Sequence, residues 1–343
     1  MPRRLKELAL QLGLSQTTVS RALNGYPEVS EATRHRVNEA AGRLGYRPNA
    51  NAIRLATGRV GAIGLALPLE RSLHFGPHTA EFLSGIGERL AQDEIDIVVS
   101  PIAADDELPV HRRLAASKRV DAVVLSAPTP DDARIKLLTD LGMPFILHGR
   151  AEVPISHAWL DIDNEGAFRH ATKHLLDLGH TRIRLINGSA RFTYAAARER
   201  GYRDALADRG LAVEDRFIAE GYMTDEVGYR FAERFLAERP RPTALLVSSM
   251  MMALGAFRAI RAAGLELGKD VSMIAHDDVF PFLNADRMVP PMSTTRSSIR
   301  AAGTRVAELA VELLAGRAAD TIHELWPVDL VVRGSTGPAP ADS

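Results

Sequence analysis

Cysteine is absent from this chain of 343 residues, which excludes disulfides, thiolate metal sites and cysteine nucleophiles and is consistent with a reducing compartment. Aromatic residues are scarce, at 6%. No uncharged apolar run approaches the roughly 18 residues that a membrane-spanning helix needs, and the N-terminal Met-Pro-Arg-Arg lacks the apolar core of an export signal. We therefore expect a cytoplasmic protein without a membrane partner.

Net charge is also nearly absent, because 42 basic residues balance 43 acidic ones to leave -1. The balance hides an uneven distribution. Residues 1–59 carry ten basic and four acidic side chains, a charge of +6, whereas the remaining residues carry -7. A basic segment on an acidic remainder indicates nucleic-acid contact by that segment, although a solvated helical surface would give the same balance.

The basic segment predicts short helices joined by tight turns. Apolar residues recur at helical spacing over 5–12, and Gly13 favours a helix end there. Ser15 is an N-cap candidate for a second helix over 16–24, and Ser30 is one for a third helix that Gly45 would end. Two helices around a Gly-containing turn are typical of a helix-turn-helix, whose second helix enters the major groove of DNA.

Three stretches of this segment carry a family resemblance. They are LSQTTVSRALNG at 14–25, VSEATR at 29–34 and LGYRPN at 44–49. They resemble the DNA-binding head of the lac repressor and galactose repressor family of bacterial transcription factors. The resemblance implies a set of DNA-binding side chains: Leu5, Ser15, Gln16, Thr17, Thr18, Ser20, Arg21, Asn24, Ser30, Thr33, Asn49 and Leu55.

Within this set, the resemblance implies that Gln16 and Thr17 read bases and that Arg21 approaches a guanine. The chemistry agrees, because Arg pairs bidentately with guanine, Gln can pair with adenine, and hydroxyls at helix starts suit phosphate oxygens. For Thr18 and Asn24, helix packing and a helix C-cap remain alternatives.

Residues 49–56 predict a helix too short to be stable alone in water. In the family this segment is the hinge helix, which pairs with its dimer mate over the minor groove, where a leucine enters the central base step. Leu55 occupies that position. Such a wedge kinks the duplex and couples folding of the hinge to DNA binding.

From residue 60 onward, apolar runs alternate with helical patterns. Strands are predicted at 60–67, 95–99, 122–126, 145–148, 158–162, 183–187, 217–220, 244–248 and 271–275. Helices are predicted near 79–92, 109–117, 131–141, 164–178, 194–209, 225–238 and 251–263. This alternation indicates βαβ units in two doubly wound parallel α/β lobes.

The body continues the resemblance through DIDNEG at 161–166, LGHTRI at 178–183, RERGY at 198–202 and Asp277-Asp278. These stretches look like the family's periplasmic-binding-protein-like core, in which the chain crosses between lobes three times. We expect a helix-turn-helix domain at 1–48, a hinge and linker at 49–59, and a core at 60–334. The first lobe would comprise 60–162 and 291–323, and the second 163–290 and 324–334.

In the family, an effector binds between the lobes at the carboxyl ends of the strands. Arg198 matches the arginine that clamps it, and Asp277 matches an aspartate that accepts hydrogen bonds from sugar hydroxyls; a structural ion pair is the alternative for each. A guanidinium opposite a carboxylate suits vicinal hydroxyls. Further candidates follow the strands: His74, Phe75, His148, Arg150, Met223, Ser249 and Phe280 or Phe282.

Two points about the effector stay open in the sequence. An aromatic wall for a sugar face is expected, but which of these rings supplies it is undecided. Ser249-Met250 stands where the family commonly has Asn-Asp, so the effector need not be that of a well-known member.

Other functions find little support. His170 and His174 share a helix face, but no carboxylate stands at zinc-motif spacing, and His180 belongs to the family's Gly-His turn. Nucleotide-binding glycine motifs and a nucleophile elbow are missing. A solute-binding receptor would need an export signal. We expect no enzyme, no catalytic residue, no metal and no cofactor.

The sequence thus predicts a sequence-specific transcriptional repressor released from double-stranded operator DNA by a small-molecule inducer, expected to be a sugar. The alternative is a non-sugar co-repressor such as a purine, which would strengthen DNA binding instead. The end of the chain, 335–343, is rich in Gly and Pro and predicts a disordered tail. Without a helical tail we expect a homodimer, matched to a pseudo-palindromic operator.

Overall fold

The computed structural model describes residues 5–23, 26, 28–44, 59–68, 76–102, 107–276 and 279–341. The chain divides into two compact units, Met1–Gly61 and Ala62–Ser343, and each is taken by itself. In the described ranges, every helix is too short or too polar to cross a membrane.

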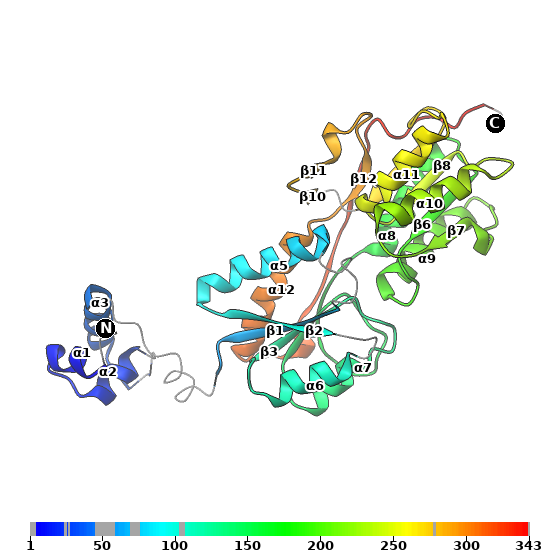
Figure 1. Cartoon of the computed structure of the whole chain (residues 1–343). Helices are drawn as coiled ribbons and strands as arrows, with labels where there is room; N and C mark the ends of the chain where they lie inside the picture. Colours follow the sequence, from blue (N-terminus) through cyan, green and yellow to red (C-terminus); the bar gives the residue numbers. More distant parts are fainter. Residues whose placement is uncertain are drawn as a thin grey trace. The chain divides into compact units, whose positions relative to one another are not determined.

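The N-terminal unit contains the helices α1 (Leu5–Leu12), α2 (Gln16–Leu23) and α3 (Glu31–Leu44) (Figure 1). Gly13 has a φ of 65°, the left-handed conformation that ends α1. The helices share a small core to which each contributes, for example through Leu8, Val19 and Val37. The predicted helices and the Gly-containing turn are confirmed.

The first lobe of the second unit contains a parallel sheet in the order β13-β5-β4-β3-β1-β2. The strands are β1 (Ala62–Pro68), β2 (Asp96–Ile102), β3 (Ala122–Ser126), β4 (Phe145–His148), β5 (Ala158–Ile162) and β13 (His323–Trp326). In the register, Leu65 of β1 lies beside Val99 of β2 and Val124 of β3. Strand order reverses between β1 and β3, which is where ligands bind in open α/β sheets.

Helices cover both faces of this sheet. α5 (Pro77–Leu90) and α12 (Ile299–Leu314) lie on one face, and α6 (Leu108–Ala116) and α7 (Ala133–Asp140) lie on the other (Figure 1). The backbones of α5 and α12 touch. A Cβ on Gly85 would lie 2.0 Å from the Arg300 carbonyl oxygen, and one on Gly303 would lie 2.3 Å from the Phe82 carbonyl oxygen. Glycine at these two positions therefore lets the helices approach.

The second lobe contains a sheet in the order β14-β12-β9-β8-β6-β7, in which only the pair β12 and β14 is antiparallel. Its strands are β6 (Ile183–Asn187), β7 (Ile218–Glu220), β8 (Ala244–Val247), β9 (Ser272–His276), β12 (Ser293–Arg296) and β14 (Asp329–Val331). The helices are α8 (Asn164–Asp177), α9 (Thr193–Ala207), α10 (Asp225–Leu236) and α11 (Met250–Ala262). A hairpin of β10 (Val279–Phe280) and β11 (Leu283–Asn284) forms a separate small sheet.

The doubly wound lobes confirm the predicted fold class, and two of the three crossings between them need correction. The second crossing was predicted near 291, but β12 joins the second lobe by pairing with β9, so the chain crosses at 297–298. The third was predicted near 324, but β13 pairs with β5, so the chain crosses at 327–328. β12 is Ser-Thr-Thr-Arg, a polar sequence without a strand pattern, and α12, β12, β13 and β14 were not predicted.

The predicted disorder of the tail is wrong for residues 335–341. Ser335 is fully buried, accepts a hydrogen bond from the Ser293 amide at 2.7 Å and donates to the Met273 carbonyl at 2.7 Å. The Gly337 carbonyl lies 3.0 Å from Nε2 of the buried His180. Gly and Pro prevent a helix here, but they do not prevent an extended segment from docking on the second lobe.

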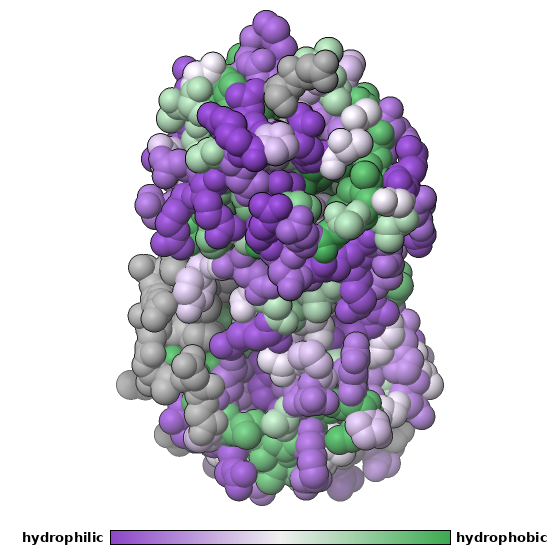
Figure 2. Space-filling view, turned by 90° about the vertical axis from the view of Figure 1, so that its right-hand side faces the viewer, coloured by the Kyte–Doolittle hydropathy of each residue, from purple (hydrophilic) through white to green (hydrophobic). Residues whose placement is uncertain are grey.

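The surface in Figure 2 is mainly hydrophilic, with hydrophobic residues in separate small patches. Hydrophobic side chains of this face therefore do not form one broad patch of the kind that marks a membrane or protein interface.

Candidate functional site

The first candidate site is the outward side of α2. Gln16, Thr17 and Arg21 are exposed, whereas Val19 and Ala22 of the same helix are buried in the core. Arg21 lies one turn after Thr17, so these side chains share the accessible side of a short helix. A helix that presents small polar groups and a guanidinium can enter a major groove and reach base edges.

Hydroxyls stand at the starts of α2 and α3 in the same arrangement. Ser15 Oγ accepts a hydrogen bond from the Thr18 amide at 3.0 Å and lies 2.8 Å from the Thr18 hydroxyl. Ser30 Oγ accepts from the Thr33 amide at 3.3 Å and lies 2.9 Å from the Thr33 hydroxyl. Both serines are exposed. These pairs fix two helix N-termini, which are favourable places for phosphate oxygens.

Of the remaining predicted DNA-binding residues, Leu5 begins α1 and packs on the head core, and Ser20 is half-buried on α2. Asn24, Asn49 and Leu55 lie outside the described residues, as do most of the predicted hinge helix and linker.

The second candidate site is a cavity of about 270 Å³ between the two lobes. Its walls include the carboxyl ends of β1, β3, β4 and β5, the first turns of α5, α9 and α12, and the crossing at Ser297 and Ser298. Across it, the Thr193 amide donates to the Pro128 carbonyl at 3.0 Å. The lobes are thus in contact around the cavity, whose volume is near the lower end of ligand pockets.

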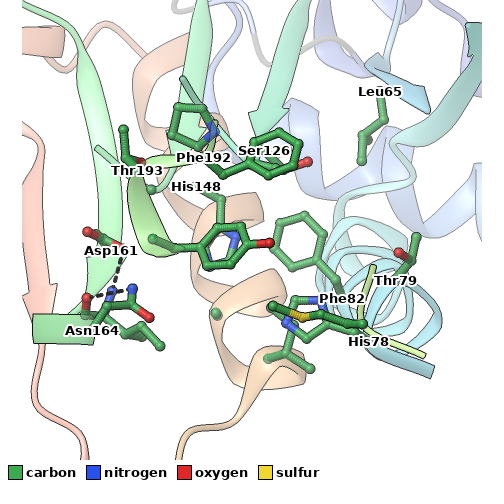
Figure 3. A pocket seen from close by; sticks show the side chains of 18 of the residues that line it. Leu65, His78, Thr79, Phe82, Ser126, His148, Asp161, Asn164, Phe192 and Thr193 are labelled. Atoms are coloured by element: carbon green, nitrogen blue, oxygen red, sulfur yellow. Dashed lines mark hydrogen bonds between the residues drawn. The ribbon is translucent and has the colours of Figure 1, made fainter. Parts of the chain in front are cut away.

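Arg198 is the anchor of the second-lobe wall. It is 5% exposed. Its Nε donates to Asn164 Oδ1 at 2.7 Å, and its Nη1 donates to the Ser248 carbonyl at 2.8 Å. Figure 3 shows Asn164 and Asp161 on the same side of the cavity. Both of these hydrogen-bond partners are neutral oxygens, and the guanidinium also favours the charged form of the nearby Asp161 carboxyl.

Asp161 supplies a carboxylate to the cavity. Its Oδ1 accepts from the Ile162 amide at 2.9 Å, and its Oδ2 accepts from Arg150 Nε at 2.9 Å. Burial raises the pKa of Asp161 above its ordinary value, and the Arg150 guanidinium opposes this shift. Arg150 also lies over the Trp159 ring, 5.6 Å from its centroid. The ring contact holds the guanidinium, and the guanidinium in turn holds the Asp161 carboxylate.

Aromatic rings line both sides of the cavity (Figure 3). In the first lobe, the rings of Phe82 and His148 are stacked with centroids 4.8 Å apart. In the second lobe, the Phe192 and Tyr194 rings are stacked with centroids 5.7 Å apart. Rings on opposite walls suit a ligand with apolar faces and polar edges.

A buried ion-pair network supports the first-lobe wall. Arg134 is 9% exposed and donates to Asp132 Oδ1 at 2.8 Å and to Glu107 Oε2 at 2.6 Å. It also donates to the Ser126 carbonyl at 3.1 Å. Since Arg134 and Glu107 both line the cavity, their charges are neutralised within the protein, and they hold the ends of β3 and α6 in place.

The structure brings His148, Arg198 and Met223 of the predicted effector residues together around the cavity. Arg150 contacts it through Asp161. Ser249 instead caps α11, where its hydroxyl accepts from the Met252 amide at 3.2 Å.

Phe280 packs against the apolar cores of both lobes, with its ring 5.8 Å from that of Phe282, which is 63% exposed. Ser249, Phe280 and Phe282 are therefore not brought to the cavity. His74, Phe75 and Asp277 lie outside the described residues.

Sequence reasoning missed the lining residues that begin helices. These are His78, Thr79 and Phe82 of α5, Phe192, Thr193 and Tyr194 at α9, and Ser297 and Ser298 before α12. The signal that could have found them is the rule that ligands lie at the carboxyl ends of parallel strands, where the following helices start. Applied to helices as well as strand ends, it points to these first turns.

The histidines considered for a metal have other environments. The His180 ring joins the Thr243 and Ser272 hydroxyls, each at 3.0 Å, to the tail at Gly337. Burial lowers the pKa of His180 below its ordinary value. Within the described ranges, no group of three or more His, Asp or Glu residues is placed to hold a metal ion.

Comparison with known proteins shows the family to which the chain belongs. Residues 4–49 match "Bacterial regulatory proteins, lacI family", and residues 172–336 match "Periplasmic binding protein-like domain". The HTH-type transcriptional regulator AglR of Rhizobium meliloti (strain 1021) is 48% identical over 341 residues, which cover 99% of this chain and 96% of AglR. The chain belongs to the lacI family of bacterial regulatory proteins. This lacI-family protein is accordingly a DNA-binding transcriptional regulator and not an enzyme.

Solved structures of the family agree. The transcriptional regulator CelR in complex with cellobiose is 29% identical, with a TM-score of 0.72, and the match covers 97% of this lacI-family chain and 99% of that one. The lac repressor dimer bound to operator and the anti-inducer ONPF is 27% identical, with a TM-score of 0.79 and coverage of 98% and 100%. The predicted family and fold are therefore confirmed.

Proposed function

We propose that this lacI-family regulator represses a sugar-utilisation operon and is released from its operator by a sugar that binds between the lobes. The observation that carries the proposal is the fixed Arg198 guanidinium, which faces a cavity also lined by Asp161 and by aromatic rings. A sugar hydroxyl both accepts and donates hydrogen bonds, so it suits a guanidinium donor and a carboxylate acceptor in one cavity. The CelR–cellobiose complex, a structure of similar fold, supports the sugar class.

The DNA-binding part of the proposal assigns base contacts to Gln16, Thr17 and Arg21, the exposed side chains of α2. Phosphate contacts are assigned to the capping pairs at the starts of α2 and α3 and, from the family resemblance, to Asn24. The same resemblance adds Leu5, Ser20 and Asn49 to the DNA-binding residues. A homodimer would place two such helices on a pseudo-palindromic operator. Leu55 would enter the minor groove at its centre.

Ligand and operator would be coupled through the arrangement of the lobes. The cavity takes residues from both lobes and from two of the crossings between them, so a bound ligand favours one arrangement. If that arrangement is unfavourable for the operator-bound dimer, ligand lowers operator affinity and operator lowers ligand affinity by the same factor, typically about 5- to 150-fold.

The test measures operator binding with and without ligand. Operator fragments are first selected from random duplexes with the full-length protein, and fluorescence anisotropy then gives operator affinity in a panel of neutral sugars and nucleobases. We expect one sugar to weaken operator binding. A nucleobase that strengthens it would instead establish the purine co-repressor alternative, because the sign of the coupling differs.

Substitutions in α9 test whether the effect of the sugar on operator binding depends on the cavity. Arg198→Ala should abolish the effect of the sugar without changing operator affinity in its absence. Arg200→Ala is the matched control, because Arg200 lies on the same helix with its side chain 53% exposed in an ion pair with Glu165. Arg198→Lys, which keeps the charge but loses the planar fork, should weaken the response. A wild-type response in Arg198→Ala would refute the proposed site.

A further inference from the structure

Tyr194 stands out among the residues that line the cavity, because an aromatic ring and a cation both contact its ring. Its ring is stacked on Phe192 with an interplanar angle of 12°. The Arg198 guanidinium lies over the ring, 5.0 Å from its centroid. Arg191 covers Phe192 in turn, 4.5 Å from its centroid. Tyr194 is therefore part of a column in which two cations enclose two stacked rings.

The hydroxyl of Tyr194 makes no hydrogen bond to any residue in the described part of the chain. Tyr194 is half-buried and lines the cavity, so its hydroxyl can donate to or accept from a bound ligand. Burial also raises the pKa of Tyr194 above its ordinary value, so the phenol keeps its proton and can donate at neutral pH. The protonated Tyr194 hydroxyl can therefore donate a hydrogen bond to a ligand in the cavity.

Gly188 gives the hydroxyl its space. A Cβ at Gly188 would lie 2.7 Å from the Tyr194 hydroxyl oxygen and 2.9 Å from Cε of Met223, another lining residue. Any other residue at 188 would push the phenol from its position. The column fixes the ring, and the glycine fixes the place of its oxygen.

We infer that the Tyr194 hydroxyl is a specificity-determining group of this regulator, which hydrogen-bonds one hydroxyl of a neutral sugar and rejects the analogue that lacks it. The inference rests on the proposed function and deepens it, because it names a recognised group on the ligand. A site built to bond a hydroxyl discriminates against its absence more strongly than an apolar pocket can. Phe192 and Arg198 hold the phenol in place, so no ordering of Tyr194 is needed when the ligand binds.

The experiment is a cycle between protein and ligand, measured by isothermal titration calorimetry on the full-length protein. The sugar found active in the operator assay is compared with its singly deoxygenated analogues. For wild type, one analogue should bind about tenfold more weakly than the parent, as expected for a lost hydrogen bond. Tyr194→Phe keeps the stacked ring and should bind the parent about tenfold more weakly, but bind that analogue and the parent equally.

Tyr229→Phe is the matched control. Tyr229 lies on α10 among the partly buried side chains of the second-lobe core, outside the set that lines the cavity, and its change should leave both affinities unaltered. Gly188→Ala should weaken binding of the parent sugar to the otherwise wild-type protein. It should weaken binding less in the Tyr194→Phe background, because the hydroxyl oxygen that the new methyl group displaces is absent there.

The outcomes separate the two proposals. If a sugar binds but every analogue loses the same affinity in wild type and in Tyr194→Phe, the role of Tyr194 is refuted and the proposed function stands. If a nucleobase binds and no sugar does, the sugar class is refuted, and the role of Tyr194 toward a sugar hydroxyl falls with it. Loss of discrimination at one hydroxyl alone supports both.

Discussion

Ser335→Ala tests whether the C-terminal segment is part of the folded regulator. The Ser335 hydroxyl is fully buried and serves two backbone groups, accepting from the Ser293 amide and donating to the Met273 carbonyl, each at 2.7 Å. These groups belong to β12 and β9, neighbouring strands of the second-lobe sheet. Alanine fits the same space but leaves an amide and a carbonyl without these partners.

The expected loss follows from these two groups. Each buried polar group left without a partner destabilises a protein by about 1–3 kcal/mol, so the two groups together should lower the free energy of unfolding of Ser335→Ala by about 2–6 kcal/mol. At about 2 °C per kcal/mol for a unit of this size, that corresponds to a fall in Tm of about 4–12 °C. The sequence expectation of a disordered tail gives no change at all, so the two expectations are well separated.

The assay is unfolding by urea and by heat, followed by circular dichroism on the full-length protein. Ser84→Ala is the matched control, because the Ser84 hydroxyl bonds the Ala80 carbonyl on an exposed helix surface, where such a change stays within about 0.5 kcal/mol. If Ser335→Ala unfolds at the same urea concentration and temperature as Ser84→Ala and wild type, the docked tail is refuted.

Three further predictions concern the first lobe and the head. Gly85→Ala should lower the free energy of unfolding by at least about 2 kcal/mol in urea, because its Cβ meets backbone at 2.0 Å; Gly87→Ala, with 3.6 Å to the Ile97 side chain, should not. A ligand that contacts Asp161 should change the fluorescence of Trp159, because Arg150 bonds Asp161 and lies over the Trp159 ring. Trp159→Phe should remove that signal, and an unchanged spectrum at ligand saturation would contradict the prediction. Operator affinity should fall by about 10³ or more between 50 and 200 mM salt, as expected for six or more phosphate contacts; a flat profile in anisotropy titrations would contradict phosphate binding by the basic head.

Local patterns were sufficient for much of the fold. Strands at 122–126, 145–148, 158–162 and 183–187 were predicted with the bounds they have in the structure, because short apolar runs between polar turns are typical of buried parallel strands. The caps at Ser15 and Ser30 were predicted for an equally local reason, since a hydroxyl three residues from an amide can bond to it within one turn.

Non-local features could not be predicted in the same way. β12 is polar, and it becomes a buried strand because Thr295 bonds His276 at 2.7 Å and Arg333 bonds Thr294 at 2.7 Å. The position of a crossing depends on which sheet accepts such a strand, and the sequence around it does not show this. Ser335 is ordered for the same reason, since its partners lie about 40 to 60 residues earlier in the chain.

Among the cavity residues, too, some could be predicted from local sequence and others could not. Arg198 was predicted because it stands in a family motif, whereas Asp161 and Tyr194 become cavity residues only through the packing of the lobes. Asp161 was already part of a quoted motif, yet nothing nearby in the sequence indicates that Arg150 would pair with it.

The contact between α5 and α12 has a mechanical consequence. Both helices begin at the cavity, and at Gly85 and Gly303 their backbones leave no room for even a methyl group between them. Two helices locked in this way bend and slide together, so they act as one stiff rod. At about 1.5 Å per residue, helices of 14 and 16 residues extend somewhat more than 20 Å. A shift imposed on either helix at the cavity would therefore be carried along both helices toward their far ends.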